Sequence, residues 1–157
     1  MAIVKKLNGH TPRFGKNCFL ADNAAIIGNV EMGDDCSIWF GAVLRGDVHE
    51  IRIGNKVNIQ DNATIHATYQ KYPTHIGNNV SIAHNAVVHG CTIHDNVLIG
   101  MGAVVLDNAV IESNTIIAAG SVVTKGTVVE SGWVYAGIPA KKIRQMGEDL
   151  LKGEVER

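Results

Sequence analysis

A repeat of six residues runs through most of this 157-residue chain. Large aliphatic or aromatic residues recur mostly six positions apart, and a small or β-branched residue lies two positions before nearly all of them. This period matches neither a helix nor simple strand alternation, and it is typical of a solenoid in which three hexapeptides close one triangular coil. The large residues are Phe14, Leu20, Ile26, Met32, Ile38, Leu44, Ile53, Ile59, Ile65, Ile76, Ile82, Val88, Ile93, Ile99, Val105, Ile111, Ile117 and Val123.

The repeat predicts an all-β solenoid, a parallel β-helix of about six triangular coils. We assign residues 12–124 to this hexapeptide β-helix. Residues 125–138 contain three glycines and are expected to form an irregular crossing. The length suits one domain, so residues 1–157 are treated as a single unit.

A C-terminal α-helix is predicted over residues 139–152. Pro139 suits the first turn of a helix, where its missing N–H leaves no hydrogen bond unmade. Apolar residues follow at near-helical spacing and should pack along the solenoid or a neighbouring subunit. They are Ile143, Met146, Leu150 and Leu151.

Composition narrows the possible roles of the chain. A net charge of -1 and a pI near 6.6 give no electrostatic basis for binding nucleic acid or an anionic membrane. The first residues lack the apolar stretch of a signal peptide, and no run approaches transmembrane length, so we expect a cytoplasmic protein. Cys18, Cys36 and Cys91 fall at the small positions of the repeat, which predicts packed thiols and no disulfide.

The six-residue spacing is interrupted where residues 45–51 and 67–75 are inserted. We expect two outward loops there, and loops that interrupt a repeat tend to lie beside the working surface.

Three histidines are the candidate metal ligands. His66 and His89 occupy the same position in neighbouring coils, about 4.8 Å apart, so their rings can converge on one ion. His84 precedes His89 by five residues and lies across a corner of the coil, facing away from that pair. The third ligand would therefore be His84 of the partner subunit. Three histidines with an open fourth position are the pattern of catalytic zinc.

Polar residues around these histidines are the other candidates for the site. Gln60 is the best partner for a metal-bound solvent molecule, and Asp61 is either a supporting partner of a ligand or a corner residue. Arg45 falls in the column of His66, and it is expected to pair with Asp47 or with an acidic group across an interface. His10, His49, His75 and His94 are expected to be solvated, with His49 the one nearest the site.

Outward-facing apolar residues on the same coils predict subunit contact rather than a cofactor site. They are Trp39, Phe40 and Met101.

Several runs of sequence carry a family resemblance. They are IWFGAVLRGD (38–47), NIQDN (58–62), IH (65–66), HN (84–85), HGCTI (89–93), LIGMG (98–102) and GIPAK (137–141).

These runs resemble the γ-class carbonic anhydrase family, and the match extends over residues 12–144. The resemblance implies a left-handed β-helix with a C-terminal helix, assembled as a homotrimer. It also implies that His66 and His89 of one subunit bind the metal together with His84 of the partner subunit. Gln60 matches the residue that hydrogen-bonds the metal-bound solvent. Arg45 and Asp47 match an interface pair.

The predicted activity is the reversible hydration of CO2 to bicarbonate, with Zn²⁺ as cofactor and Fe²⁺ or Co²⁺ as further possibilities. The candidate catalytic residues are Gln60, Arg45, Asp47 and Asp61. The chain lacks a long acidic proton-shuttle loop and resembles the short branch of the family. An acyl-CoA transferase or thioesterase that uses one histidine as a general base is an alternative. A metal-binding trimer without turnover is another.

Overall fold

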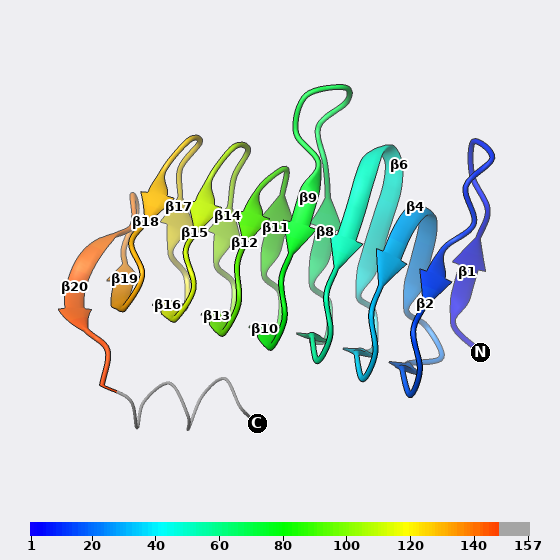
Figure 1. Cartoon of the computed structure of the whole chain (residues 1–157), viewed down its shortest axis with the longest axis horizontal. Helices are drawn as coiled ribbons and strands as arrows, with labels where there is room; N and C mark the ends of the chain where they lie inside the picture. The colour runs from blue at the N-terminus through cyan, green and yellow to red at the C-terminus, as the bar shows by residue number, and fades with distance from the viewer. Residues whose placement is uncertain (148–157) are drawn as a thin grey trace.

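The computed structural model describes residues 1–147 and shows a parallel β-solenoid of about seven coils (Figure 1). The coils follow one another along a single axis, from the N-terminal coil at one end to the C-terminal coil at the other. Each coil contributes short strands to three faces, and these strands pair with their equivalents in the coils on either side. The predicted all-β solenoid is confirmed.

Three faces close the triangular cross-section. The first contains β1 (Ile3–Lys5), β4 (Ala25–Met32), β6 (Val43–Ile53), β8 (Thr64–His66), β11 (Val87–His89), β14 (Val104–Val105) and β17 (Val122–Val123). The second contains the later halves of β4 and β6 with β2 (Arg13–Phe14), β9 (Thr74–Ile76), β12 (Thr92–Ile93), β15 (Val110–Ile111) and β18 (Val128–Val129). The third contains β3 (Phe19–Leu20), β5 (Ser37–Ile38), β7 (Asn58–Ile59), β10 (Val80–Ile82), β13 (Val97–Ile99), β16 (Thr115–Ile117), β19 (Trp133–Ala136) and β20 (Lys141–Gln145).

The interior is filled by the large residues of the repeat. Those from Ile26 to Val123 are all buried, and Phe14 and Leu20 in the first coil pack against them while partly exposed. Burying one such side chain stabilises the fold by about 1.5 to 3 kcal/mol. Cys36 and Cys91 are buried in this core as free thiols, as predicted, and burial raises their pKa values to about 11 and about 12.

Residues 125–138 do not form an irregular crossing. Val129 and Tyr135 continue the six-residue repeat into a seventh coil, and their strands pair with β15 and β16. The glycines that suggested irregularity are corner residues. Gly132 has φ +86°, in the column where Asn114 has φ +61° one coil earlier. Glycine adopts this left-handed conformation without the steric cost that other residues incur.

The predicted C-terminal helix is wrong for residues 139–147, and the remainder of that prediction lies outside the described residues. Residues Lys141–Gln145 form β20, which pairs antiparallel with β19. A strand is favoured here because β19 ends the third face and would otherwise leave one edge of backbone groups unpaired. Lys142 forms an ion pair with Glu130 and lies 4.6 Å from the ring centre of Trp133. Residues 1–147 contain no helix able to cross a membrane.

The two interruptions of the repeat have different structures. Residues 45–51 belong to β6, where the extra residues form a bulge between Gly46, which pairs with Gly28, and Ile51, which pairs with Val30. The expected loop is therefore part of a strand, because its backbone pairs with β4 on both sides of the corner. Residues 67–73 do form an outward loop between β8 and β9 (Figure 1).

Corner side chains tie each coil to the one before it. Asp34, Asn55, Asn78 and Asp95 each accept a hydrogen bond from a backbone N–H one coil earlier, at 2.7 to 2.8 Å. These contacts satisfy backbone donors at positions where the strands are interrupted. A carboxylate or amide at a corner therefore reaches back by one coil.

The seventh coil can be tested with neighbouring valines. Val129 is fully buried, whereas Val128 is 62% exposed. We expect Val129→Ala to lower the free energy of unfolding by about 2 kcal/mol. Val128→Ala should change it by less than about 0.5 kcal/mol. Urea denaturation of both variants measures this difference, and equal small effects would mean that residues 125–136 are not part of the packed solenoid.

Candidate metal centre

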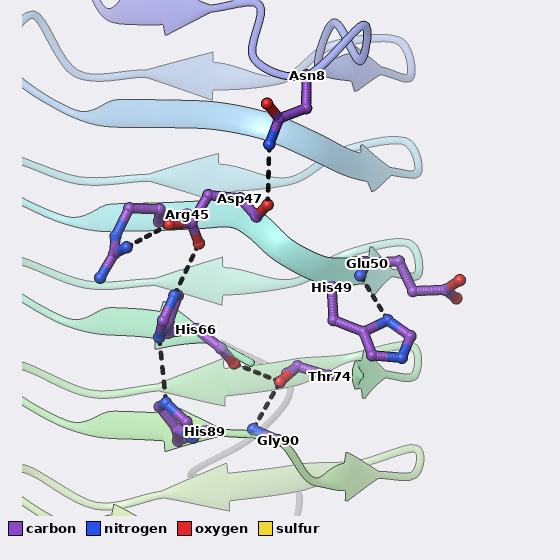
Figure 2. Close-up of polar contacts among 9 residues, drawn as sticks. All are labelled: Asn8, Arg45, Asp47, His49, Glu50, His66, Thr74, His89 and Gly90. Carbon is purple, nitrogen blue, oxygen red and sulfur yellow. Dashed lines mark hydrogen bonds and ion pairs between the residues drawn. The ribbon is translucent and has the colours of Figure 1, made fainter. Parts of the chain in front are cut away.

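Two histidines lie side by side on the first face of the solenoid. His66 ends β8 and His89 ends β11, and the two residues pair directly in the sheet. Nδ1 of His66 lies 3.1 Å from Nε2 of His89 (Figure 2). The alignment that the repeat predicted for this pair is confirmed.

A carboxylate contacts each ring on the side away from the other histidine. Oδ1 of Asp47 lies 2.8 Å from Nε2 of His66, and Oδ1 of Asp107 lies 2.7 Å from Nδ1 of His89. Partial burial raises the pKa of Asp47, but hydrogen bonds from His66 and Arg45 outweigh it and hold the pKa below its usual value. Partial burial also raises the pKa of Asp107, but hydrogen bonds from Thr68 and His89 outweigh this effect and lower the pKa. Both carboxyls are therefore ionised at neutral pH.

The ionised carboxylates determine which ring nitrogens are free to bind a ligand. A carboxylate without its proton can only accept, so each neutral ring carries its proton on the nitrogen that faces the carboxylate. The two nitrogens that face each other, 3.1 Å apart, are then the ones left to bind a metal ion. Two nitrogens bound to one tetrahedral zinc at about 2.0–2.1 Å would lie about 3.3 Å apart. The donors, their spacing and the supporting carboxylates therefore fit two ligand positions of a zinc ion.

His84 lies apart from this pair, in the turn between β10 and β11. Its Nδ1 lies 3.1 Å from Oδ1 of Asp61. It also lines a cavity of about 490 Å³ on the third face, together with Gln60 and Met101. Among residues 1–147 no three His, Cys, Asp or Glu side chains gather closely enough to hold a metal ion. A contribution from the partner subunit remains a prediction.

The other predicted site residues divide between these two places. Arg45 donates a hydrogen bond of 2.5 Å to Oδ2 of Asp47, so the predicted pairing is present. Gln60 follows β7 and lies with His84 in the cavity of the third face. Asp61 contacts His84, as a supporting partner would. The chemical roles of these residues stay predictions.

Asp107, Thr68 and Thr74 are site residues that the sequence analysis missed. Asp107 contacts His89 by reaching back one coil, as other corner residues do. Thr68 donates a hydrogen bond of 2.6 Å to the second oxygen of Asp107. The available signal was an aspartate two residues after β14, and its role follows only once the corner side chains are known to reach back by one coil.

The fully buried Thr74 joins the backbones of the two histidine strands. Its hydroxyl donates to the carbonyl of His66 at 2.5 Å and accepts from the N–H of Gly90 at 2.8 Å (Figure 2). Thr74 thus reinforces the direct bond of 3.2 Å between this N–H and this carbonyl, next to the residues that carry the imidazoles.

Other histidines in the region make separate contacts. Nδ1 of His49 accepts a hydrogen bond from the N–H of Glu50 (Figure 2). Nε2 of His75 lies 2.8 Å from Oε2 of Glu50. His94 lies 3.9 Å from Glu112. These pairs lie outside the His66–His89 contact.

The solenoid and its repeat are those of hexapeptide-repeat proteins, and comparison with known proteins identifies the family within that class. The family model described as "Bacterial transferase hexapeptide (six repeats)" matches residues 11–46, 73–105 and 90–125. A carbonic anhydrase of Geobacillus kaustophilus is 42% identical over 155 residues, which cover 99% of this chain and 84% of the relative. The mitochondrial gamma carbonic anhydrase 2 of Arabidopsis thaliana is 44% identical over 144 residues. That alignment covers 88% of this chain, and the chain spans only 52% of the plant protein.

A solved structure agrees with the fold. A hexapeptide transferase family protein from Anaplasma phagocytophilum superposes with a TM-score of 0.92 and 42% identity, covering 98% of this chain and 90% of that one. The chain is thus a hexapeptide-repeat protein. Within that class it belongs to the γ-class carbonic anhydrase family.

Thr74 gives a test of the site geometry. We expect Thr74→Val to lower the free energy of unfolding by about 1 to 3 kcal/mol, because it removes both hydrogen bonds of the buried hydroxyl and leaves the Gly90 N–H and the His66 carbonyl only their direct bond of 3.2 Å. Thr74→Ser keeps the hydroxyl and should lose less than about 1 kcal/mol. Urea denaturation in the presence of a chelator measures this without any contribution from metal. Equal losses in the two variants would contradict the bridging role.

Proposed function

We propose that the protein is a metal-dependent carbonic anhydrase that catalyses the reversible hydration of CO2 to bicarbonate. The main support is the pair of imidazole nitrogens that face each other at 3.1 Å, with an ionised carboxylate beside the other nitrogen of each ring. His66 and His89 would hold the metal with His84 of the partner subunit. Zinc suits three imidazole ligands with an open position, and imidazole also suits Fe²⁺ and Co²⁺.

The metal and the protein would supply different parts of the chemistry. Zinc held at such a site supplies the Lewis acidity that lets a water molecule lose its proton near neutral pH. Asp47 and Asp107 orient the rings of His66 and His89, and Arg45 holds Asp47 in its ionised form. Asp61 would orient His84 in the same way. Gln60 would present its amide to the attacking solvent and to CO2 without adding charge.

The surroundings of His84 support a homotrimer with shared sites. Phe40 and Met101 flank the Asp61–His84 pair at the same corner, in the coils on either side, and are 47% and 57% exposed. Trp39 is 37% exposed, and the centre of its ring lies 4.9 Å from that of Phe19. Apolar side chains around a histidine are suited to a surface that another subunit covers. The same contact would carry His84 to the histidine pair of the neighbour.

A second candidate function is transfer of an acyl group from coenzyme A. It is favoured by the Anaplasma phagocytophilum neighbour, which is described as a hexapeptide transferase family protein. His84, oriented by Asp61 beside a cavity of about 490 Å³, could act as the general base. Thioesterase or transferase activity that survives complete chelation, but is lost in His84→Ala, would favour this function over hydration.

Hydration itself is tested by stopped-flow measurement of CO2 turnover on metal-loaded protein. We expect a rate well above that of buffer, which chelation abolishes and Zn²⁺ or Co²⁺ restores. His66→Ala and His89→Ala should lose metal and activity together, whereas His94→Ala should retain both. Full metal occupancy without turnover would instead indicate a metal-binding trimer that does not catalyse hydration.

The shared site is tested by mixing inactive variants. In trimers formed from His84→Ala and His66→Ala chains, we expect one intact site per mixed trimer, with His66 and His89 from the first chain and His84 from the second. Co-refolding followed by measurement of bound zinc checks this. Mixing His66→Ala with His89→Ala is the matched control and should restore nothing, since both residues come from one protomer. Mixed trimers that gain no metal would contradict the shared geometry.

A further inference from the structure

Asp107 links the histidine pair to a surface loop through both of its carboxylate oxygens. Oδ1 lies 2.7 Å from Nδ1 of His89, and Oδ2 accepts a hydrogen bond of 2.6 Å from the hydroxyl of Thr68. Thr68 lies in the outward loop 67–73, and Asp107 follows β14 one coil beyond His89. The carboxylate therefore cannot rotate away from the imidazole without breaking its contact with the loop.

The space for this carboxylate depends on a glycine. A Cβ added at Gly90 would lie 2.4 Å from Oδ1 of Asp107 and 3.0 Å from Cβ of Tyr72, distances at which the neighbours must move. Gly90 also has φ +59°, a conformation that side chains disfavour. The residue after His89 thus leaves room for Asp107 to approach the ring from the next coil.

The loop that carries Thr68 is itself closed by backbone and side-chain contacts. The backbones of Thr68 and Tyr72 exchange hydrogen bonds of 3.0 and 3.2 Å. The ammonium of Lys125 lies 5.5 Å from the ring centre of Tyr72, within range of a cation–π contact. Thr68 is therefore held in position, and it holds Asp107 in turn.

We propose that Asp107 is the positioning residue of His89 and that Thr68 couples the 67–73 loop to the metal centre through it. This inference rests on the proposed function, because His89 is taken there as a metal ligand. Asp107 fixes the ring orientation and keeps its proton on Nδ1, so that Nε2 presents its lone pair towards His66. Carboxylates that support a ligating histidine in this way typically contribute about 10- to 100-fold to metal affinity.

Metal affinity of the full-length protein, measured by competition with a chromophoric chelator, tests the proposal. Asp107→Ala should weaken Zn²⁺ and Co²⁺ binding by about 10- to 100-fold and change the visible spectrum of bound Co²⁺. Thr68→Val should weaken binding by about 2- to 10-fold, the value of one hydrogen bond, and Thr68→Ser should rescue the affinity. Asp95→Ala is the matched control. Its carboxylate also reaches back one coil, but to the N–H of Asn78 at 2.7 Å, so metal affinity should not change.

A second measurement is independent of metal and of catalysis. With ¹⁵N-labelled histidine in the chelated protein, the neutral ring of His89 should carry its proton on Nδ1 in the wild type. It should become a mixture of tautomers in Asp107→Ala. Asp107→Leu has a similar shape and no acceptor, so it should give the same mixture of tautomers if the alanine variant fails to fold.

The possible outcomes separate this proposal from the proposed function. Unchanged affinity and unchanged tautomer in the Asp107 variants would overturn the positioning role, as would an equal loss in Asp95→Ala. A wild-type protein that binds metal without hydrating CO2 would contradict the proposed function alone. If the wild type bound no metal, the tautomer measurement would still decide whether Asp107 orients His89.

Discussion

The parallel hydrogen-bonded register between successive coils is the constraint on which the rest of this structure depends. It places each residue directly beside its counterpart in the next coil, so that isoleucines pack on isoleucines inside and corners lie on corners outside. A slip of one residue would turn every buried side chain of a strand outwards. The spacing of the two histidines is therefore set by the strand pairing of all the coils together. The two strands that carry these residues need little specialised structure of their own.

The candidate centre is built where that register is interrupted. The bulge in β6 brings Asp47 to His66, and the loop after β8 brings Thr68 to Asp107. Both insertions lie at corners, where extra residues leave the strand pairing on either side unchanged. The regular coils thus set the distance between the two histidines. The inserted residues supply the charge of Asp47 and the hydrogen bond of Thr68. This division lets a repetitive scaffold carry one localised site.

The sequence predicted those features that follow directly from periodicity. The buried columns and the alignment of His66 with His89 follow from counting along the repeat. Asp47 was one of two predicted partners of Arg45, and that prediction rested on the positive charge of the arginine beside His66. Asp107 was missed because its contact depends on which way a corner side chain turns, and spacing contains no such information. Val129 and Tyr135 continue the six-residue repeat, but the glycines around them suggested irregular structure. These glycines occupy the same left-handed corner positions that asparagine occupies in earlier coils. A helix was predicted in place of β20 because the local sequence has a weak preference for helix. Pairing with the open edge of the sheet outweighs that preference. Handedness was available only from the family resemblance, since a six-residue period is compatible with either hand.

The direction of β20 also bears on how copies of this protein can meet. A solenoid that ended in a parallel strand would offer the next molecule the pattern its own coils use, and chains could join end to end into fibres. On the third face, the last strand among residues 1–147 runs the opposite way, with five exposed side chains that include two lysines and an arginine. Parallel and antiparallel edges differ in the spacing of their donors and acceptors, so an incoming first coil would find mismatched partners. End-to-end addition in the register of the coils is therefore disfavoured on this face, whereas the other two faces end in the parallel strands β17 and β18.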